Sequence, residues 1–261
     1  MRLLVLLSFV FPLFGCFVGN PGSPSIMNQG FFSSTYPIFK ATTGYLGDYT
    51  SDKRYVSTRS STPDELRHFG IHSQMATVSV IFLERLEILG AAGGSKEHAK
   101  WAQNATMSDI TTTLLDFEST YQFSWGIGAK VILLQWGQTF LTTDYNYFCV
   151  PTSQKSYFRF LNRLNLNLMT EKQTFSIREW QVSAGLASRF FFVTPYGGIT
   201  YLNSKLDIHS GVGIPPLYYR NKEHFGYYYG LTLSLTGRMH ITMERRVRDE
   251  FSYSIAATLV F

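Results

Sequence analysis

The side chains that could do chemistry in this sequence are charged residues that stand at every second position between apolar ones. Side chains two residues apart on a β-strand point the same way, so these residues would share one face of a sheet. If the sheet closed on itself, they would line its interior, where rings of like charge favour the opposite ion. The candidates for this lining are Lys130, Arg159, Arg163, Glu179, Arg189, His240, Glu244 and Arg246.

Basic residues outnumber acids among these candidates, so a pore that they lined would have a mild preference for anions. The alternative is that the same residues form salt bridges across a filled lumen and pass nothing. A pore needs a continuous polar path along Lys130, Arg159 and Arg163, whereas a plug would fill that path, for example with residues 17–37.

The histidines and serines form no recognisable catalytic or metal-binding motif. His72-Ser73, His209-Ser210 and His240 with Glu244 are the pairs that could supply a nucleophile or a base. None of them stands in a pattern such as G-x-S-x-G, and the histidines lack metal-ligand spacing. We therefore expect neither an enzyme nor a cofactor or metal site.

The composition favours strands and contact with an apolar surrounding. Charged residues make up 16% of the 261 residues, against roughly 25% in ordinary soluble domains. Aromatic residues also make up 16%, with 22 Phe and 16 Tyr, which are types that favour strands and interfaces. The net charge of +5 is modest and no Lys/Arg block is present, so a nucleic-acid partner is not expected.

The first residues indicate export. Arg2 precedes the apolar stretch 3–14, which is too short for a membrane helix of about 20 residues but suits a signal peptide. Leu13-Phe14-Gly15-Cys16 resembles a bacterial lipobox, in which Cys16 would be lipidated after cleavage; the alternative is ordinary cleavage nearby. We therefore expect a signal peptide over 1–15, followed by a periplasmic arm or plug over 16–37.

Period-two alternation runs through the remaining chain and predicts an all-β fold. The last segment is the clearest, with large apolar side chains at alternate positions Phe251, Tyr253, Ile255, Leu259 and Phe261. Many segments run well beyond the usual five or six residues, which fits tilted membrane strands with about 9–11 residues in hydrocarbon. Strands can lie in lipid only as a closed barrel, because every backbone polar group must be paired. The alternative is a large soluble β-sandwich, which also alternates.

We predict a single transmembrane antiparallel β-barrel over residues 38–261, with about 12 strands and a range of ten to sixteen. Short periplasmic turns are expected at 83–85, 194–195 and 236–237, and longer outer loops at 51–68, 94–106 and 206–222. The strands are expected near 38–50, 69–83, 85–93, 107–117, 121–135, 138–150, 157–169, 175–193, 195–205, 223–236, 238–247 and 250–261.

Four short blocks, together with the terminal strand, resemble the chlamydial major outer membrane porin family. They follow the family order from the mature N-terminus to the last residue. The blocks are Val18-Gly19-Asn20-Pro21 with Gly44-Tyr45-Leu46-Gly47-Asp48-Tyr49, then Phe123-Ser124-Trp125-Gly126-Ile127-Gly128-Ala129-Lys130, then Glu179-Trp180-Gln181-Val182 leading to Pro195-Tyr196-Gly197-Gly198, and finally Glu244-Arg245-Arg246-Val247-Arg248-Asp249-Glu250.

The resemblance implies a porin of the bacterial cell outer membrane that passes small solutes or ions by diffusion, often as a homotrimer. It also implies that the barrel-assembly machinery recognises the terminal strand through Phe261. The chain departs from the family by being shorter and by having only two cysteines, so disulfide cross-linking is not carried over. Fewer strands also narrow the lumen, since about 8 leave room only for side chains and 16–18 leave a channel.

Two functions remain open at this point. The first is a porin with a mild anion preference. The second is a plugged, non-conducting barrel that acts as a surface antigen, adhesin or structural envelope protein. The content of the lumen distinguishes them.

Overall fold

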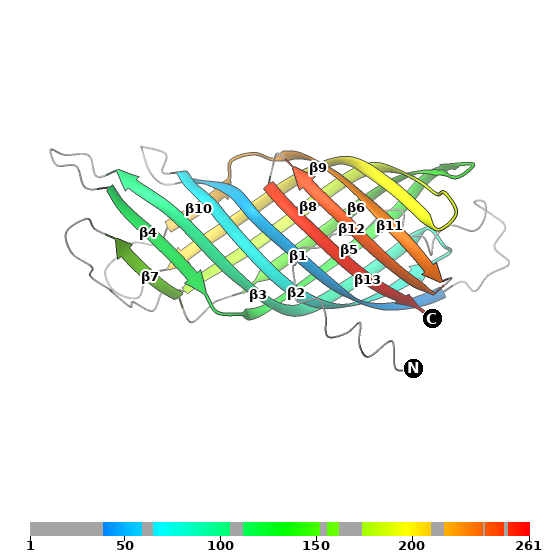
Figure 1. The fold of residues 1–261 in the computed structure, drawn as a ribbon, viewed down its shortest axis with the longest axis horizontal. Helices are drawn as coiled ribbons and strands as arrows, with labels where there is room; N and C mark the ends of the chain where they lie inside the picture. Colours follow the sequence, from blue (N-terminus) through cyan, green and yellow to red (C-terminus); the bar gives the residue numbers. More distant parts are fainter. Residues whose placement is uncertain are drawn as a thin grey trace.

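Thirteen β-strands lie in the described part of the chain, and all of them belong to one antiparallel sheet (Figure 1). The computed structural model describes residues 39–58, 65–104, 112–151, 156–161, 174–209, 217–236, 238–247 and 250–261. The strands are β1 (Phe39–Ser57), β2 (Glu65–Phe82), β3 (Leu86–Asn104), β4 (Thr112–Ser119), β5 (Gln122–Trp136), β6 (Thr139–Val150), β7 (Ser156–Leu161), β8 (Thr174–Ser188), β9 (Val193–His209), β10 (Leu217–Asn221), β11 (Phe225–Thr236), β12 (Met239–Val247) and β13 (Glu250–Val260).

Ten of these strands close into a barrel. Each pairs with the next in the order β1, β2, β3, β5, β6, β8, β9, β11, β12 and β13, and β13 pairs back with β1. At the point of closure, Asp48 on β1 lies between Ser73 on β2 and Ser254 on β13. A closed ring leaves no unpaired edge, which is the requirement for strands in lipid. The prediction of an all-β transmembrane antiparallel barrel is confirmed.

The ring has ten strands, which is within the predicted range but two below the central prediction of twelve. β4 and β5 both pair with β3 in the same direction and are separated only by Thr120 and Tyr121. In the same way, β6 pairs with β5 and β7 pairs with β4, on either side of a break that begins at Pro151. The described parts of the segments predicted at 107–117 and 157–169, which are 112–117 and 157–161, therefore prolong neighbouring strands and add no member to the ring.

Short turns connect the strands at one end of the barrel, and the chain ends there too (Figure 1). The turn at 83–85 is confirmed. Of the expected turn at 236–237, Thr236 belongs to β11 and Gly237 lies outside the described residues. The expected turn at 194–195 is wrong, because both residues belong to β9 and the turn spans 189–192. Phe191 has a positive φ of 53° in that turn, and the ladder between β8 and β9 ends at Tyr196, so Pro195 lies beyond it.

At the opposite end, strands replace much of the predicted loops. β1 continues to Ser57, β3 to Asn104 and β9 to His209, so large parts of 51–68, 94–106 and 206–222 are strand. β10 pairs with both β9 and β1 and so fills the gap beyond the ends of β11, β12 and β13. The two faces of the sheet exchange polarity at this end. Apolar residues such as Ile71 and Ile177 are buried inside the barrel, while their polar neighbours in the sequence face outward.

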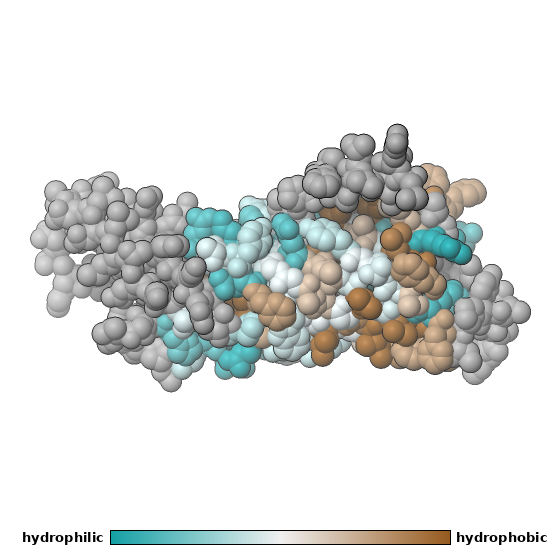
Figure 2. Space-filling view, turned by 90° about the horizontal axis from the view of Figure 1, so that it is seen from below, coloured by the Kyte–Doolittle hydropathy of each residue, from teal (hydrophilic) through white to brown (hydrophobic). Residues whose placement is uncertain are grey.

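A belt of apolar and aromatic side chains covers the outside of the barrel nearer the short turns. Figure 2 shows hydrophobic side chains gathered toward one end of that face and hydrophilic ones toward the other. The described residues contain no helix long and apolar enough to cross a membrane. The belt includes Val78, Ile88, Phe123, Ile127, Leu186, Ile199, Tyr227, Tyr229, Met243, Tyr253 and Leu259, all of which are exposed.

Several predicted features fall on residues that the structure does not describe. These are the signal peptide over 1–15, Cys16, the arm or plug over 16–37, and Arg163. The backbone of Arg159 lies in β7, but its side chain is outside the described part.

Candidate functional site in the barrel interior

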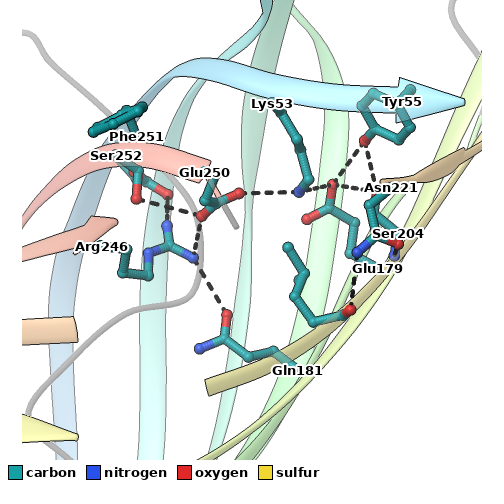
Figure 3. Close-up of polar contacts among 12 residues, drawn as sticks. Lys53, Tyr55, Glu179, Gln181, Ser204, Asn221, Arg246, Glu250, Phe251 and Ser252 are labelled. Carbon is teal, nitrogen blue, oxygen red and sulfur yellow. Dashed lines mark hydrogen bonds and ion pairs between the residues drawn. The ribbon is translucent and has the colours of Figure 1, made fainter. Parts of the chain in front are cut away.

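Ion pairs join five charged side chains in the barrel interior, and Figure 3 labels four of them, Lys53, Glu179, Arg246 and Glu250. We call Asp48, Lys53, Glu179, Arg246 and Glu250 the interior network. Each of these residues is at most 3% exposed. They come from four strands, β1, β8, β12 and β13, that are brought together only by the closure of the barrel.

Lys53 connects opposite sides of the barrel. A β-bulge after Thr50 shifts the register of β1 with β13, so that Lys53 points inward. Its Nζ lies 2.7 Å from Oε1 of Glu179 on β8 and 3.1 Å from Oε2 of Glu250 on β13. β1 and β8 are five steps apart in either direction around the ten-stranded ring. A direct contact between them means that side chains span the lumen.

Arg246 joins the other members of the network. Its Nη2 lies 2.7 Å from Oδ2 of Asp48, and its Nη1 lies 2.6 Å from Oε1 of Glu250. Nη1 also donates to Oε1 of Gln181 at 3.3 Å. Hydrogen bonds between charged groups are about twice as strong as neutral ones, so Arg246 holds β12 to β1, β8 and β13.

Neutral partners extend the network to β9 and β10. Ser204 donates its hydroxyl to Oε1 of Glu179 at 2.8 Å and lies 2.6 Å from the hydroxyl of Tyr55. The backbone N–H of Ser204 donates to Oδ1 of Asn221 on β10 at 2.9 Å. The strand that closes the outer end is therefore tied to the same buried cluster.

An apolar cluster fills the interior beyond the network, toward β10. Tyr55 packs edge-on against Phe69, with ring centroids 5.2 Å apart. Such a cluster excludes water from the surfaces that its side chains bury. The cluster also contains Ile71, Val150, Phe175, Ile177, Leu206 and Tyr219, all buried.

Two buried tyrosines lie in the interior on the other side of the network. Tyr196 donates its hydroxyl to Oε2 of Glu244 at 2.9 Å, and its ring lies so close to Gly230 that an added Cβ would overlap it. The hydroxyl of Tyr228 occupies the equivalent space over Gly185. Glycine in the middle of a strand is unfavourable unless something approaches closely, and here the approaching group is an aromatic ring.

The structure places most of the sequence-predicted lining residues on the inward face. Glu179, His240, Glu244 and Arg246 are buried there, and Lys130 is half-buried opposite Asp144 on β6.

The other predicted residues are placed differently. Arg189 lies in the turn between β8 and β9 rather than within a strand, and Arg159 belongs to β7, outside the closed ring. Phe261, the predicted assembly signal, is 74% exposed, and its N–H donates to the carbonyl oxygen of Ala41.

Sequence reasoning missed three members of the network. Asp48 and Glu250 each lie two positions from a residue of the same strand that faces inward, so the alternation of the sequence could have identified them. Lys53 had no such signal, because it fell in a predicted loop and follows a bulge that reverses the parity.

Among the described residues, which do not include Ser210, the catalytic candidates form no complete constellation. Nδ1 of His240 lies 3.1 Å from Oγ of Ser234, but its Nε2 has no hydrogen-bond partner in the described part of the chain. His72 and Ser73 face opposite sides of β2. Among the described residues, no three His, Cys, Asp or Glu side chains are grouped to hold a metal ion.

The closed antiparallel ring, the apolar outer belt and the polar interior define a β-barrel of the bacterial outer-membrane class. No family model and no curated protein matches the sequence. The strand pairing and the side-chain pattern define the class, whereas resemblance to chlamydial porins stays a prediction.

Distant likenesses exist among solved structures. The outer membrane protease OmpT from Escherichia coli is 10% identical, with 88% of this chain and 98% of that chain covered and a TM-score of 0.43. An outer membrane channel from Pseudomonas putida F1 is 8% identical, with 90% and 100% covered and a TM-score of 0.40. Ail, the attachment invasion locus protein of Yersinia pestis, is 12% identical, with 85% and 97% covered and a TM-score of 0.31.

Proposed function

We propose that this protein is a non-conducting outer-membrane barrel that presents its outer end as a surface for recognition or envelope contact. The observation that carries the proposal is the contact between Lys53 and Glu179, which joins opposite strands of the ring. Salt bridges across a filled lumen therefore describe the interior better than an open polar path does.

The energetics of the network favour a lumen that stays closed. Separating a buried ion pair costs about 3–5 kcal/mol when one charge is left without its partner. A cost of this size leaves an open state below about 1% of the population. Ten strands also give a barrel closer in width to the filled eight-stranded type than to channels of 16–18.

The porin hypothesis makes a different prediction for the same protein. It rests on the resemblance to chlamydial porins and on the inward position of Lys130, Glu244 and Arg246. A conducting barrel would need those side chains to face a water-filled path, and the current would then favour anions.

A planar-bilayer experiment separates the two functions. Refolded protein, shown to be inserted by its heat-modifiable migration on a gel, is measured under a salt gradient. We expect no conductance steps from the natural sequence. Sustained steps with an anion-selective reversal potential would overturn the proposal and establish the porin.

A pair of neighbouring arginines supplies the matched variants. Arg246→Ala removes the hub of the interior network, whereas Arg245→Ala removes a guanidinium on the outer face that lies 5.1 Å from the Tyr253 ring. We expect brief current events from Arg246→Ala, because water enters to solvate the carboxylates left behind. Arg245→Ala is expected to stay silent.

A further inference from the structure

A row of basic side chains crosses the outside of three adjacent strands at one level. Arg178 on β8 is directly opposite Lys205 on β9, and Lys205 is directly opposite Arg220 on β10. All three are exposed, while the neighbouring Ile177 and Leu206 are buried on the other face. The three cations therefore point away from the lumen.

Two more basic residues lengthen this row. The backbone N–H of Lys222 donates to the carbonyl oxygen of Arg54 on β1 at 2.9 Å, and both side chains are exposed. We call Arg54, Arg178, Lys205, Arg220 and Lys222 the basic row. It follows the sheet from β8 to β1 through β10, the strand that closes the outer end.

The neighbouring acids do not neutralise the centre of the row. Oδ2 of Asp207 lies 2.5 Å from Nη2 of Arg178, and Oδ1 of Asp52 lies 3.4 Å from Nδ1 of His68. Within the described residues, neither Lys205 nor Arg220 forms an ion pair. Like charges directly opposite each other on paired strands are destabilising, so an anion that binds here would relieve a repulsion that the fold retains.

The row lies next to a patch of aromatic rings on the same outer face. Trp180 follows Arg178 by two residues, which is roughly 7 Å along a strand. Its ring lies 5.4 Å from that of Tyr201, which in turn lies 5.1 Å from that of Phe225. Aromatic rings mark the membrane interface in barrels of this class, so the basic row stands at the level of lipid headgroups.

We propose that the basic row binds the phosphate groups of an outer-leaflet glycolipid whose acyl chains lie along the apolar belt. The row is at the end away from the short turns, which in bacterial barrels is the outer face. Guanidinium groups bind phosphate in a two-pronged geometry, and Lys adds a point charge. A lipid is favoured over a free anion because aromatic and apolar surface continues directly from the cations. The inference does not depend on whether the lumen conducts.

Native mass spectrometry of the refolded full chain tests this binding. The protein is released from detergent micelles that contain diphosphoryl lipid A, and retained lipid is compared between the natural sequence and Lys205→Gln/Arg220→Gln. We expect the double variant to bind about tenfold more weakly, from two lost exposed contacts with phosphate. Arg238→Gln, an exposed basic residue at the short-turn end, is the matched control and should retain lipid A fully.

Two further arms identify the ligand. Phosphatidylcholine should be retained equally by all variants, and inorganic phosphate at the same phosphate concentration should not displace lipid A. Equal retention of lipid A by the natural sequence and the double variant would overturn the proposal. So would displacement by inorganic phosphate, which would show an anion site without a lipid component.

Folding of the variants is checked separately. If the double variant does not show heat-modifiable migration, the single variants Lys205→Gln and Arg220→Gln are measured, each with an expected loss of about threefold. If both single variants retained as much lipid A as the natural sequence, the basic row would be rejected as the binding site.

Discussion

Replacement of Lys53 by methionine should destabilise the barrel strongly, because Lys53 is a fully buried cation with two carboxylate partners. Methionine keeps most of the length of the side chain but removes the cation that contacts Glu179 and Glu250. Each of those carboxylates would remain buried, and a buried charge without its cation must either recruit water or become protonated.

The structure sets the size of the expected loss. Breaking a buried pair by removing one partner costs about 3–5 kcal/mol. Glu179 keeps its hydrogen bond from Ser204, and Glu250 keeps its contact with Arg246. We therefore expect Lys53→Met to lower the free energy of unfolding by about 3 kcal/mol, at the low end of that range. In Lys53→Met/Glu179→Gln, where the opposing charge is also removed, the loss should fall to about 1 kcal/mol.

Urea unfolding in lipid vesicles, followed by tryptophan fluorescence and by gel migration, measures these differences. Arg245→Met is the control, because Arg245 contacts the Tyr253 ring on the outer face and should contribute at most about 1 kcal/mol. A loss below about 1 kcal/mol for Lys53→Met would refute the reasoning. It would mean that the interior is hydrated and that the network carries no buried charge.

Two other changes test the packing and the assembly of the barrel. Gly230→Ala should lower stability by about 1–3 kcal/mol in urea unfolding, because the new methyl group overlaps both the Tyr196 ring and the backbone carbonyl oxygen of Met243. Gly90→Ala, with no atom within 4 Å of the added Cβ, is the control, and equal effects would contradict the packing. Removal of Phe261 should impair membrane assembly in cells, seen as loss of heat-modifiable protein, whereas Phe191→Ala in an exposed turn should assemble normally; equal assembly would exclude Phe261 as the recognition signal.

The half of the barrel near the short turns could be predicted from the sequence. There the strands alternate between lipid and lumen, so Phe251 and Tyr253 face outward and Glu244 and Arg246 inward, as the alternation predicts. Alternation is a strong signal when one face meets hydrocarbon and the other carries polar groups.

The outer half could not be predicted in the same way, because the polarity of the two faces is exchanged. Ile177 faces inward and Arg178 outward, which reverses the apolar-out pattern of the half that meets lipid. The bulge before Lys53 adds a second reversal. The central prediction of twelve strands exceeds the ring of ten for a different reason. Alternation shows that a segment is extended but not whether the chain turns back at a break such as Pro151.

The position of β10 has a consequence for the time course of folding. Tyr218 accepts a backbone hydrogen bond from Thr58, 160 residues earlier, and β10 can make this contact only where β1 and β9 already stand on either side of it. Contacts of such long sequence separation form slowly, because the entropy of closing the intervening chain must be overcome first. We therefore expect the outer end to close last, after the ten-stranded ring. Until then the apolar cluster beneath β10 is open to water, which makes the interval before closure the period when chaperones and proteases can act on the chain.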